Sequence, residues 1–320
     1  MSKIPSSITS RWRVLAALAA VYSIWGGTYL AIRFAIETVP PFLMVGSRFV
    51  IAGAILYAWM RLSGAPAPTR IQWRSAAIIG GLLLLGGNGV LAWAEQLVPS
   101  GLAALMIATV PVWMVLLDWL RGGAARPNLG VTIGLVLGLA GIALLAGPTN
   151  IAGGNHMNSF GVLLLLFAAI SWASGSLYAR RAPIPATPLL ATAMEMLVGG
   201  GLAIAAGLIT GEWGQLRLDQ VSLRSLQSFG YLVVFGSLVG FSAYTWLLRA
   251  TSTAIASTYA YVNPVVAVFL GWALASEPLT LQTILAAAII VMAVVIITTN
   301  QSKKSAPKPA NAVAGVAQAE

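Results

Sequence analysis

The sequence predicts an all-α integral membrane protein in which ten transmembrane helices form two inverted five-helix repeats around a central cavity. Three observations support this fold class. Hydrophobic residues make up 58% of the 320 residues, charged residues make up 8%, and the mean hydropathy is +0.87. Apolar segments of about 20 residues recur along the chain, and each is long enough to cross roughly 30 Å of hydrocarbon. The two halves of the chain also resemble each other.

The predicted spans follow one another with short connections. They cover approximately residues 14–34, 41–60, 75–94, 101–119, 129–147, 159–178, 189–209, 229–248, 255–276 and 280–299. The polar segment after Asn300 has no apolar periodicity and is typical of a disordered tail. We therefore divide the chain into an N-terminal segment 1–12, a first five-helix repeat 13–150, a second, inverted repeat 151–300 and a tail 301–320.

The basic residues indicate how the chain is oriented. Of the 18 Lys and Arg residues, fourteen lie in the N-terminal segment, the even-numbered loops or the tail. Three lie in the odd-numbered loops, and Arg48 lies inside a span. Short cationic loops remain in the cytoplasm, so we expect both termini there, in a multi-pass protein of the inner (plasma) membrane. Topology thus explains the formal net charge of +10, and the expected partner is the lipid bilayer, with no nucleic acid.

Several kinds of chemistry lack the residues they need. The sequence has no cysteine, which excludes disulfides and thiolate catalysis. It has one histidine and no recognisable phosphate-binding loop, metal-ligand cluster or nucleophile–base pair. We therefore expect no cofactor, no metal ion and no enzymatic activity. An integral membrane enzyme is the remote alternative, because such enzymes usually cluster His, Asp or Cys near one face.

Two blocks of matched residues relate the halves, the first at a shift of 147 residues and the second at a shift of 153. The matched pairs include Trp25 with Trp172, Gly53 with Gly200, Gly87 with Gly240, and Pro111 with Pro264. Because each half has an odd number of predicted spans, the second half enters the membrane from the opposite side. Inverted repeats are common in secondary transporters, whose substrate site lies at the repeat interface near the midplane.

Several motifs resemble those of the EamA-type drug/metabolite transporter superfamily. They are Tyr22-Ser23-Ile24-Trp25-Gly26-Gly27-Thr28-Tyr29, Pro40-Pro41 leading to Arg48-Phe49, Ala108-Thr109-Val110-Pro111-Val112, Tyr261-Val262-Asn263-Pro264-Val265, and Glu277-Pro278-Leu279-Thr280. The similarity covers roughly residues 13–300 and is greatest to the YedA-like inner-membrane exporters. It implies a ten-helix basket whose cavity is lined by helices 1, 3, 4, 6, 8 and 9, and the export of amino acids or other small metabolites. The first span lacks the membrane-embedded carboxylate of the related small multidrug exporters, which argues against their cation–proton exchange.

Arg48 and Glu195 are charged residues inside predicted spans, at equivalent positions of the two repeats. A charge at such depth costs on the order of 2.5–3.5 kcal/mol, so each should face protein or water. In a functional interpretation, Arg48 holds a substrate carboxylate and Glu195 is a partner or proton carrier. In the structural alternative, each residue braces a neighbouring helix.

Two other carboxylates lie at span ends. Glu95 ends the third span and is a candidate proton-exchange group, with a solvated carboxylate at a helix end as the structural alternative. Glu277 precedes the tenth span, where a carboxylate near a helix N-terminus is favourable, and we interpret it as structural.

Pro111 and Pro264 lie near the middle of equivalent spans, where proline removes a helical hydrogen bond and produces a kink. We predict that they are hinges between two conformations. Asn263 precedes Pro264, and Asn88 lies within the glycine-rich segment of the third span, so both amides are candidates for the substrate cavity. The structural alternative for the glycines is close helix packing.

Aromatic residues on the expected cavity helices complete the candidate site. Their rings can stack on an apolar or aromatic metabolite while their polar tips orient it. The alternative is an interfacial belt at headgroup depth. The candidates are Trp25, Tyr29, Trp93, Trp172, Tyr178 and Tyr259.

The glycines of the fifth span, from Gly130 to Gly141, predict a packing face, with a homodimer interface as the alternative. We expect a transporter that exports a small neutral or zwitterionic metabolite, amino-acid-like or aromatic, by alternating access, either coupled to protons or uncoupled. A passive facilitator or uptake permease of the same fold is the main alternative.

Overall fold

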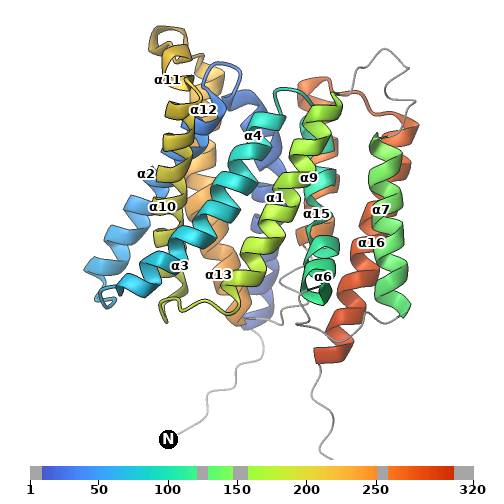
Figure 1. Cartoon of the computed structure of the whole chain (residues 1–320), viewed down its shortest axis with the longest axis horizontal. Coiled ribbons are helices and arrows are strands. Elements are labelled where there is room, and N and C mark those ends of the chain that lie inside the picture. The colour runs from blue at the N-terminus through green and yellow to red at the C-terminus, as the bar shows by residue number, and fades with distance from the viewer. Residues whose placement is uncertain (1–8, 121–128, 147–157, 251–258, 306–320) are drawn as a thin grey trace, which may run out of the picture.

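The computed structural model describes residues 9–120, 129–146, 158–250 and 259–305, and all regular secondary structure in these residues is helical (Figure 1). The described elements of the first half are α1 (Thr9–Ala35), α2 (Pro41–Leu62), α3 (Arg70–Gly80), η1 (Gly81–Gly89), α4 (Val90–Ala94), α5 (Ser100–Ile107), α6 (Val110–Leu120) and α7 (Leu129–Ala146).

The second half repeats this order. Its described elements are α9 (Ser159–Ala179), α10 (Pro188–Ile209), α11 (Glu212–Gln215), η2 (Leu218–Gln220), α12 (Leu223–Tyr231), η3 (Leu232–Val239), α13 (Gly240–Ala250), α15 (Tyr259–Ala275) and α16 (Leu281–Ser305). The helix α16 continues five residues past Asn300, into the segment predicted as a tail, and residues 306–320 lie outside the described part.

By length and composition, seven continuous helical stretches in the described residues can cross a membrane. They are Trp12–Ala35, Pro41–Leu62, Arg70–Ala94, Ser100–Leu120, Ser159–Ala179, Pro188–Ile209 and Leu223–Tyr244. Three further apolar stretches, Leu129–Leu144, Val262–Ala275 and Leu281–Ile297, are shorter and lie at the positions predicted for spans 5, 9 and 10. The total of ten spans therefore stays a prediction.

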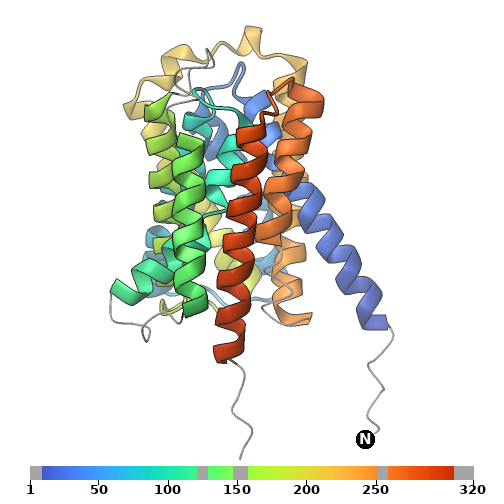
Figure 2. The same ribbon diagram turned by 90° about the vertical axis from the view of Figure 1, so that its right-hand side faces the viewer.

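The helix α1 begins, and α16 ends, at the same end of the bundle (Figure 2). We call this the terminal end, and the end that carries α11 and the starts of α2, α5 and α9 the distal end. Several helices begin where the sequence provides a start signal. Pro41 and Pro188 occupy the first turns of α2 and α10, and Thr69 and Gln72 form a capping box at α3.

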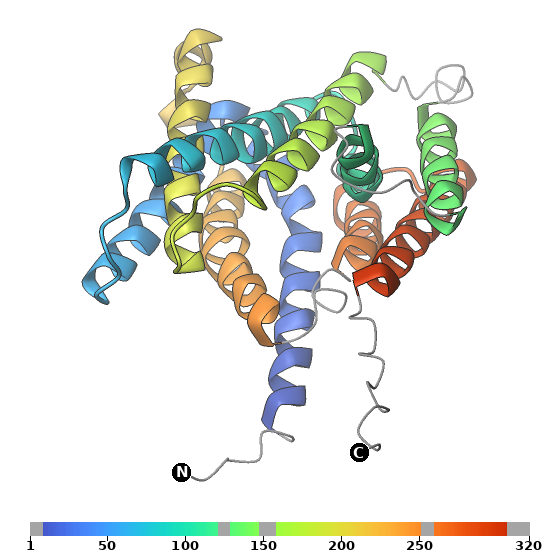
Figure 3. The ribbon, with the colours of Figure 1, turned by 60° about the horizontal axis from the view of Figure 1, so that its bottom comes forward.

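Helices that hold equivalent places in the two halves pack against each other. The pair α2 and α10 lies at one edge of the bundle and the pair α7 and α16 lies at the other. Between them, α1 contacts α13 and α15, and α9 correspondingly contacts α4 and the α5–α6 segment (Figure 3). This two-fold pattern of contacts is what a duplicated fold requires.

Glycines allow the edge pairs to approach closely. A Cβ at Gly46 would lie 2.7 Å from the Ile204 amide nitrogen, and a Cβ at Gly200 would lie 2.9 Å from the Gly46 carbonyl oxygen. The glycines of α7 pack on Ile290, Ala293 and Ile297 of α16. This contact confirms the predicted packing face, and the chain's own α16 covers it. Close approach matters because lipid provides no hydrophobic driving force between helices.

We predict that Gly200→Ala destabilises the fold, because the added methyl group meets backbone atoms of α2 that cannot move independently. Overpacking of this kind costs about 1–3 kcal/mol. The matched control is Gly201→Ala, where nothing lies within 4 Å of the new Cβ and the better helix propensity of alanine favours stability. Thermal unfolding in detergent checks this, and an equal midpoint for Gly200→Ala and the wild type would contradict it.

Candidate functional site

Both halves contain a π-helical segment at the equivalent place, η1 (Gly81–Gly89) in the third span and η3 (Leu232–Val239) in the eighth. The glycine-rich run of the third span therefore widens the helix without breaking it. A π-helical turn disturbs the regular pattern of hydrogen bonds and often marks a functional site. The two segments are the only π-helices in the described residues, and each faces the first helix of the other half.

Trp25 of α1 lies against η3. Its Nε1 donates to the Gly236 carbonyl oxygen at 3.1 Å, and any side chain at Gly240 would overlap the indole ring. Trp25 also contacts the rings of Phe241, Tyr244 and Tyr259, each with ring centroids 5.2 Å apart. The ring contacts of Trp25 thus join α1, α13 and α15 into one aromatic cluster.

Trp172 of α9 lies against η1 in the corresponding way. A Cβ at Gly87 would lie 2.8 Å from Trp172 Cε3, and the neighbouring Ser171 Oγ donates to the Leu82 carbonyl oxygen at 2.8 Å. Trp25 matches Trp172 and Gly240 matches Gly87 in the sequence repeats. Each half therefore places its tryptophan on the matched glycine of the other half.

We predict that Trp25→Phe lowers stability by about 1–3 kcal/mol, because the ring remains while the buried Gly236 carbonyl loses its side-chain donor. Trp272→Phe is the control, since Trp272 is half exposed on the surface of α15. Thermal unfolding of both variants in detergent is the measurement. A Trp25→Phe midpoint as high as that of the control would mean that the hydrogen bond is unimportant.

The fourth span is interrupted beside Pro111. Helix α5 ends at Ile107, helix α6 begins at Val110, and the Thr109 hydroxyl between them donates to the Met106 carbonyl oxygen at 2.6 Å. The matching Pro264 lies inside the continuous helix α15. The two prolines are thus not equivalent in the described residues, and the segment 251–258 that precedes α15 lies outside them.

Arg48 is 3% exposed and lies between α2 and η3. Its Nε donates to Ser237 Oγ at 2.9 Å, Ser237 in turn donates to the Leu232 carbonyl oxygen, and Nη1 has no hydrogen-bond partner. Glu195 is partly buried on α10. The ion pairs in the described residues are Arg181 with Asp118 and Arg224 with Glu37, so Arg48 and Glu195 are not paired.

Glu95 is completely buried at the distal end, and neither carboxyl oxygen has a hydrogen-bond partner. The expectation of a solvated carboxylate was therefore wrong. Arg33 donates to the backbone carbonyl of Glu95, and Glu277 and Tyr29 are close enough to interact with its charge. Burial, followed by repulsion from Glu277, raises the pKa of Glu95 well above its usual value, and Arg33 opposes this. The surroundings thus favour the neutral form of the carboxyl group.

Two carboxylates of the second half cap helices of the first half at the distal end, and we call these contacts the distal caps. Glu277 accepts from the Ser100 amide and hydroxyl, both at 2.7 Å, and from the Gly101 amide at 2.9 Å. Glu212 accepts from the amides of Phe42 at 3.2 Å and Leu43 at 2.9 Å. Burial raises the pKa of Glu212, and these two hydrogen bonds oppose the shift. Glu277 is structural as predicted, but it caps α5 and not its own helix.

The remaining predicted residues are more scattered. Asn263 is buried with its Oδ1 unpartnered, Asn88 donates to the Leu83 carbonyl oxygen at 3.4 Å, and Tyr178 is partly buried near the end of α9. Trp93 contacts the ring of Phe160 and lies outside the Trp25 cluster. The sequence reasoning missed Phe241, Tyr244 and Ser237, although Phe241 directly follows the matched Gly240.

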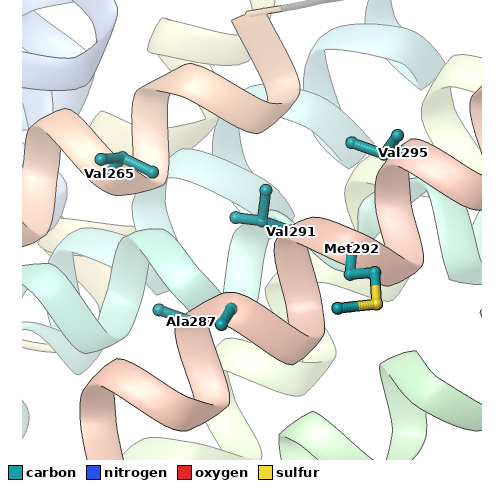
Figure 4. A pocket seen from close by; sticks show the side chains of 6 residues that line it. Val265, Ala287, Val291, Met292 and Val295 are labelled. Atoms are coloured by element: carbon teal, nitrogen blue, oxygen red, sulfur yellow. The ribbon is translucent and has the colours of Figure 1, made fainter.

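Open grooves occur on the described part of the chain, and two of them bear on the site. One, of about 350 Å³, is lined by Ser23, Gly27, Leu30, Ala31, Phe34, Gln227, Ser228, Tyr231 and Leu270. The other, of about 380 Å³, has only Val265, Ala287, Ala288, Val291, Met292 and Val295 in its walls (Figure 4). Val265 and Met292 are more than half exposed, so this second groove suits a lipid chain and not a polar metabolite.

Comparison with known proteins agrees with this architecture. The EamA-like transporter family matches the chain twice, at residues 11–147 and 159–299. The chain is 43% identical to YedA of Escherichia coli (strain K12), named an uncharacterized inner membrane transporter, over 83% of this chain and 84% of that protein. YoaV of Bacillus subtilis (strain 168), named an uncharacterized transporter, is 25% identical over 86% of this chain and 93% of its own.

A solved crystal structure shares the fold, with a TM-score of 0.58 and 21% identity over 91% of this chain and 99% of that one. The two family matches correspond to the two halves that exchange their tryptophan–glycine contacts. The chain therefore belongs to the EamA-like transporter family and contains the family's domain twice.

Proposed function

We propose that this transporter crosses the inner membrane ten times, with both termini in the cytoplasm, and exports a small neutral or zwitterionic metabolite by alternating access. The observation that carries the proposal is the exchange of equivalent contacts between the halves. Trp25 on Gly240 and Trp172 on Gly87 are matched, so two conformations that interchange their roles would contain similar contacts and have similar energies. Inverted repeats give alternating access in this way.

The distal caps support a resting state that is closed at the distal end. Glu277 holds the N-terminus of α5, whose residues 100–106 are all buried, and Glu212 holds that of α2. The connections of the first half at the opposite face, residues 63–69 and 121–128, contain no Asp or Glu in the sequence. The terminal face has the ion pair between Arg181 and Asp118 at 3.7 Å, and the Arg181 side chain is largely exposed. The two faces are thus unequal among the described contacts, because carboxylates accept hydrogen bonds from the helix N-termini of the other half at the distal end.

We predict that Glu277→Gln opens the distal end, because the amide keeps an acceptor but loses the charge. Loss of about 1–2 kcal/mol corresponds to a roughly tenfold larger open population. The chain is free of cysteine, so Ala103→Cys on the buried α5 gives a single reporter. Labelling by a membrane-impermeant maleimide from the distal side measures the opening.

Glu37→Gln is the matched control for this experiment, since Glu37 also lies at the distal end but pairs with the exposed Arg224 at 3.4 Å. In the Ala103→Cys background, Glu37→Gln should be labelled at the same rate as Ala103→Cys alone. Faster labelling in Glu37→Gln, or an unchanged rate in Glu277→Gln, would show that the caps do not hold this end closed.

Glu95 is the proposed proton carrier. In the closed state it is buried and neutral, whereas a distal opening would admit water and allow it to ionise. Because the closed state has the higher pKa, it binds the proton more tightly and loses stability relative to the open state as the pH rises. A proton gradient can therefore bias the cycle.

We predict that a pH gradient changes flux through the wild-type protein in liposomes and has no effect on Glu95→Gln, which mimics the neutral carboxyl at all pH values. Labelled amino acids and amphipathic metabolites are the probes, and Glu37→Gln is again the control. Wild-type flux that is unchanged when the gradient collapses would indicate a passive facilitator. A gradient response retained in Glu95→Gln would move the proton site to Glu195.

A further inference from the structure

Arg48 is a buried cation whose hydrogen-bonding capacity is incompletely used. A guanidinium group has five N–H donors in a planar fork. Nε is bonded to Ser237, and Nη1 has no partner. The guanidinium carbon lies 4.6 Å from the Phe49 ring centroid, which stabilises the charge without using a donor. One arm of the fork, Nη1, therefore has an unused hydrogen-bonding capacity.

The surroundings hold the guanidinium in place but leave its charge unbalanced. No carboxylate pairs with Arg48 in the described residues, and Tyr231 is the titratable group whose electrostatic effect reaches it. The Ser237 hydroxyl is fixed, because it donates onward to the Leu232 carbonyl. A purely structural brace would be expected to satisfy both arms of the fork, since an unpaired buried charge is costly.

The glycine of the π-helical segment η3 lets the guanidinium approach the backbone closely. A Cβ at Gly236 would lie 3.1 Å from Nη2 and 3.3 Å from the Thr28 methyl carbon. The Gly236 carbonyl receives the Trp25 hydrogen bond, so the Nη2 side of the guanidinium lies next to the aromatic cluster on which the two halves meet. At a shift of 153 residues, Ser237 of η3 matches Leu84 of η1. The hydroxyl that orients a guanidinium is therefore present in the second half and absent at the matched position of the first.

A planar fork with one net charge fits a carboxylate, which guanidinium binds through two parallel hydrogen bonds. A phosphate dianion would need a second cation beside Arg48. No other Lys or Arg of the described residues is seen in contact with this guanidinium. We propose that Arg48, positioned by Ser237, is the subsite for a substrate carboxylate, with the apolar part of the substrate directed toward Trp25. This inference rests on the proposed transport function and narrows its substrates to carboxylate-bearing metabolites.

The test compares two solutes that differ only in the carboxylate: L-phenylalanine and its amide. Thermal unfolding of the protein in detergent measures binding, and flux into liposomes measures transport. In the wild type we expect the amino acid to bind about tenfold or more tightly than the amide, which is the loss expected for a charge-assisted pair. In Arg48→Gln this preference should fall to about twofold or less.

Two variants separate a binding role from a structural one. Arg48→Lys retains the charge but not the fork and should keep part of the preference. Arg61→Gln removes an exposed charge from the other end of α2 and should leave the preference unchanged. If Arg48→Gln weakens both solutes equally, Arg48 is a brace and the inference is overturned. The inference would also be overturned if inorganic phosphate stabilised the wild-type protein as much as L-phenylalanine does at the same concentration.

The outcome remains distinct from that of the proposed function. As a further probe we add L-alanine, a carboxylate with a small side chain. If the protein transports other solutes but neither L-phenylalanine nor L-alanine stabilises it, the carrier function stands and the carboxylate subsite is overturned. Stabilisation by the carboxylates that depends on Arg48, without flux, would preserve the subsite and count against transport.

Discussion

The structure depends on one constraint: in hydrocarbon every backbone polar group needs a partner within the protein. Most of the described chain satisfies it with helices. In the π-helical segments, the other half supplies side-chain donors: Trp25 reaches Gly236 and Ser171 reaches Leu82. Tyr231 also reaches the Ile24 carbonyl of the regular helix α1 at 2.9 Å. The π-helical segments are thus places where side chains of one half bond to the backbone of the other, and a movement between the halves would have to exchange these bonds.

Glycine sets where such movement is restricted. At the edges, Gly46 and Gly200 bring α2 and α10 into backbone contact, which resists sliding because backbone atoms cannot rotate out of the way. At the centre, Gly87 and Gly240 face flexible side-chain rings instead. A rigid edge and a central contact made by side chains are compatible with the proposed alternating access, in which one half would rock against the other.

The sequence predicted the fold well and the site in part, for physical reasons. The matched Trp and Gly pairs predicted a duplication. Matched positions in two repeats do not reveal, however, that each tryptophan packs on the glycine of the other half. Glu95 looked like a helix end near water, since a sequence position gives depth and not burial. Ser237 was not predicted as a site residue, because a single hydroxyl in an apolar segment does not indicate a function. Pro264 suggested a hinge by symmetry, yet α15 continues through it, because tertiary packing can retain a helix that has lost one bond.

The difference between the two faces affects the populations of the states that are open to each face. If the distal end is closed at rest, the binding-competent population faces the terminal end, and the apparent affinity at each face scales with the fraction of time spent open there. Solute on the terminal side is then bound at lower concentrations. This bias alone cannot drive net export, because a ligand shifts an equilibrium only by its differential affinity for the two states. Net direction needs a second gradient, and the buried Glu95, one turn beyond Leu91 and beside the distal caps, lies where proton release would accompany opening.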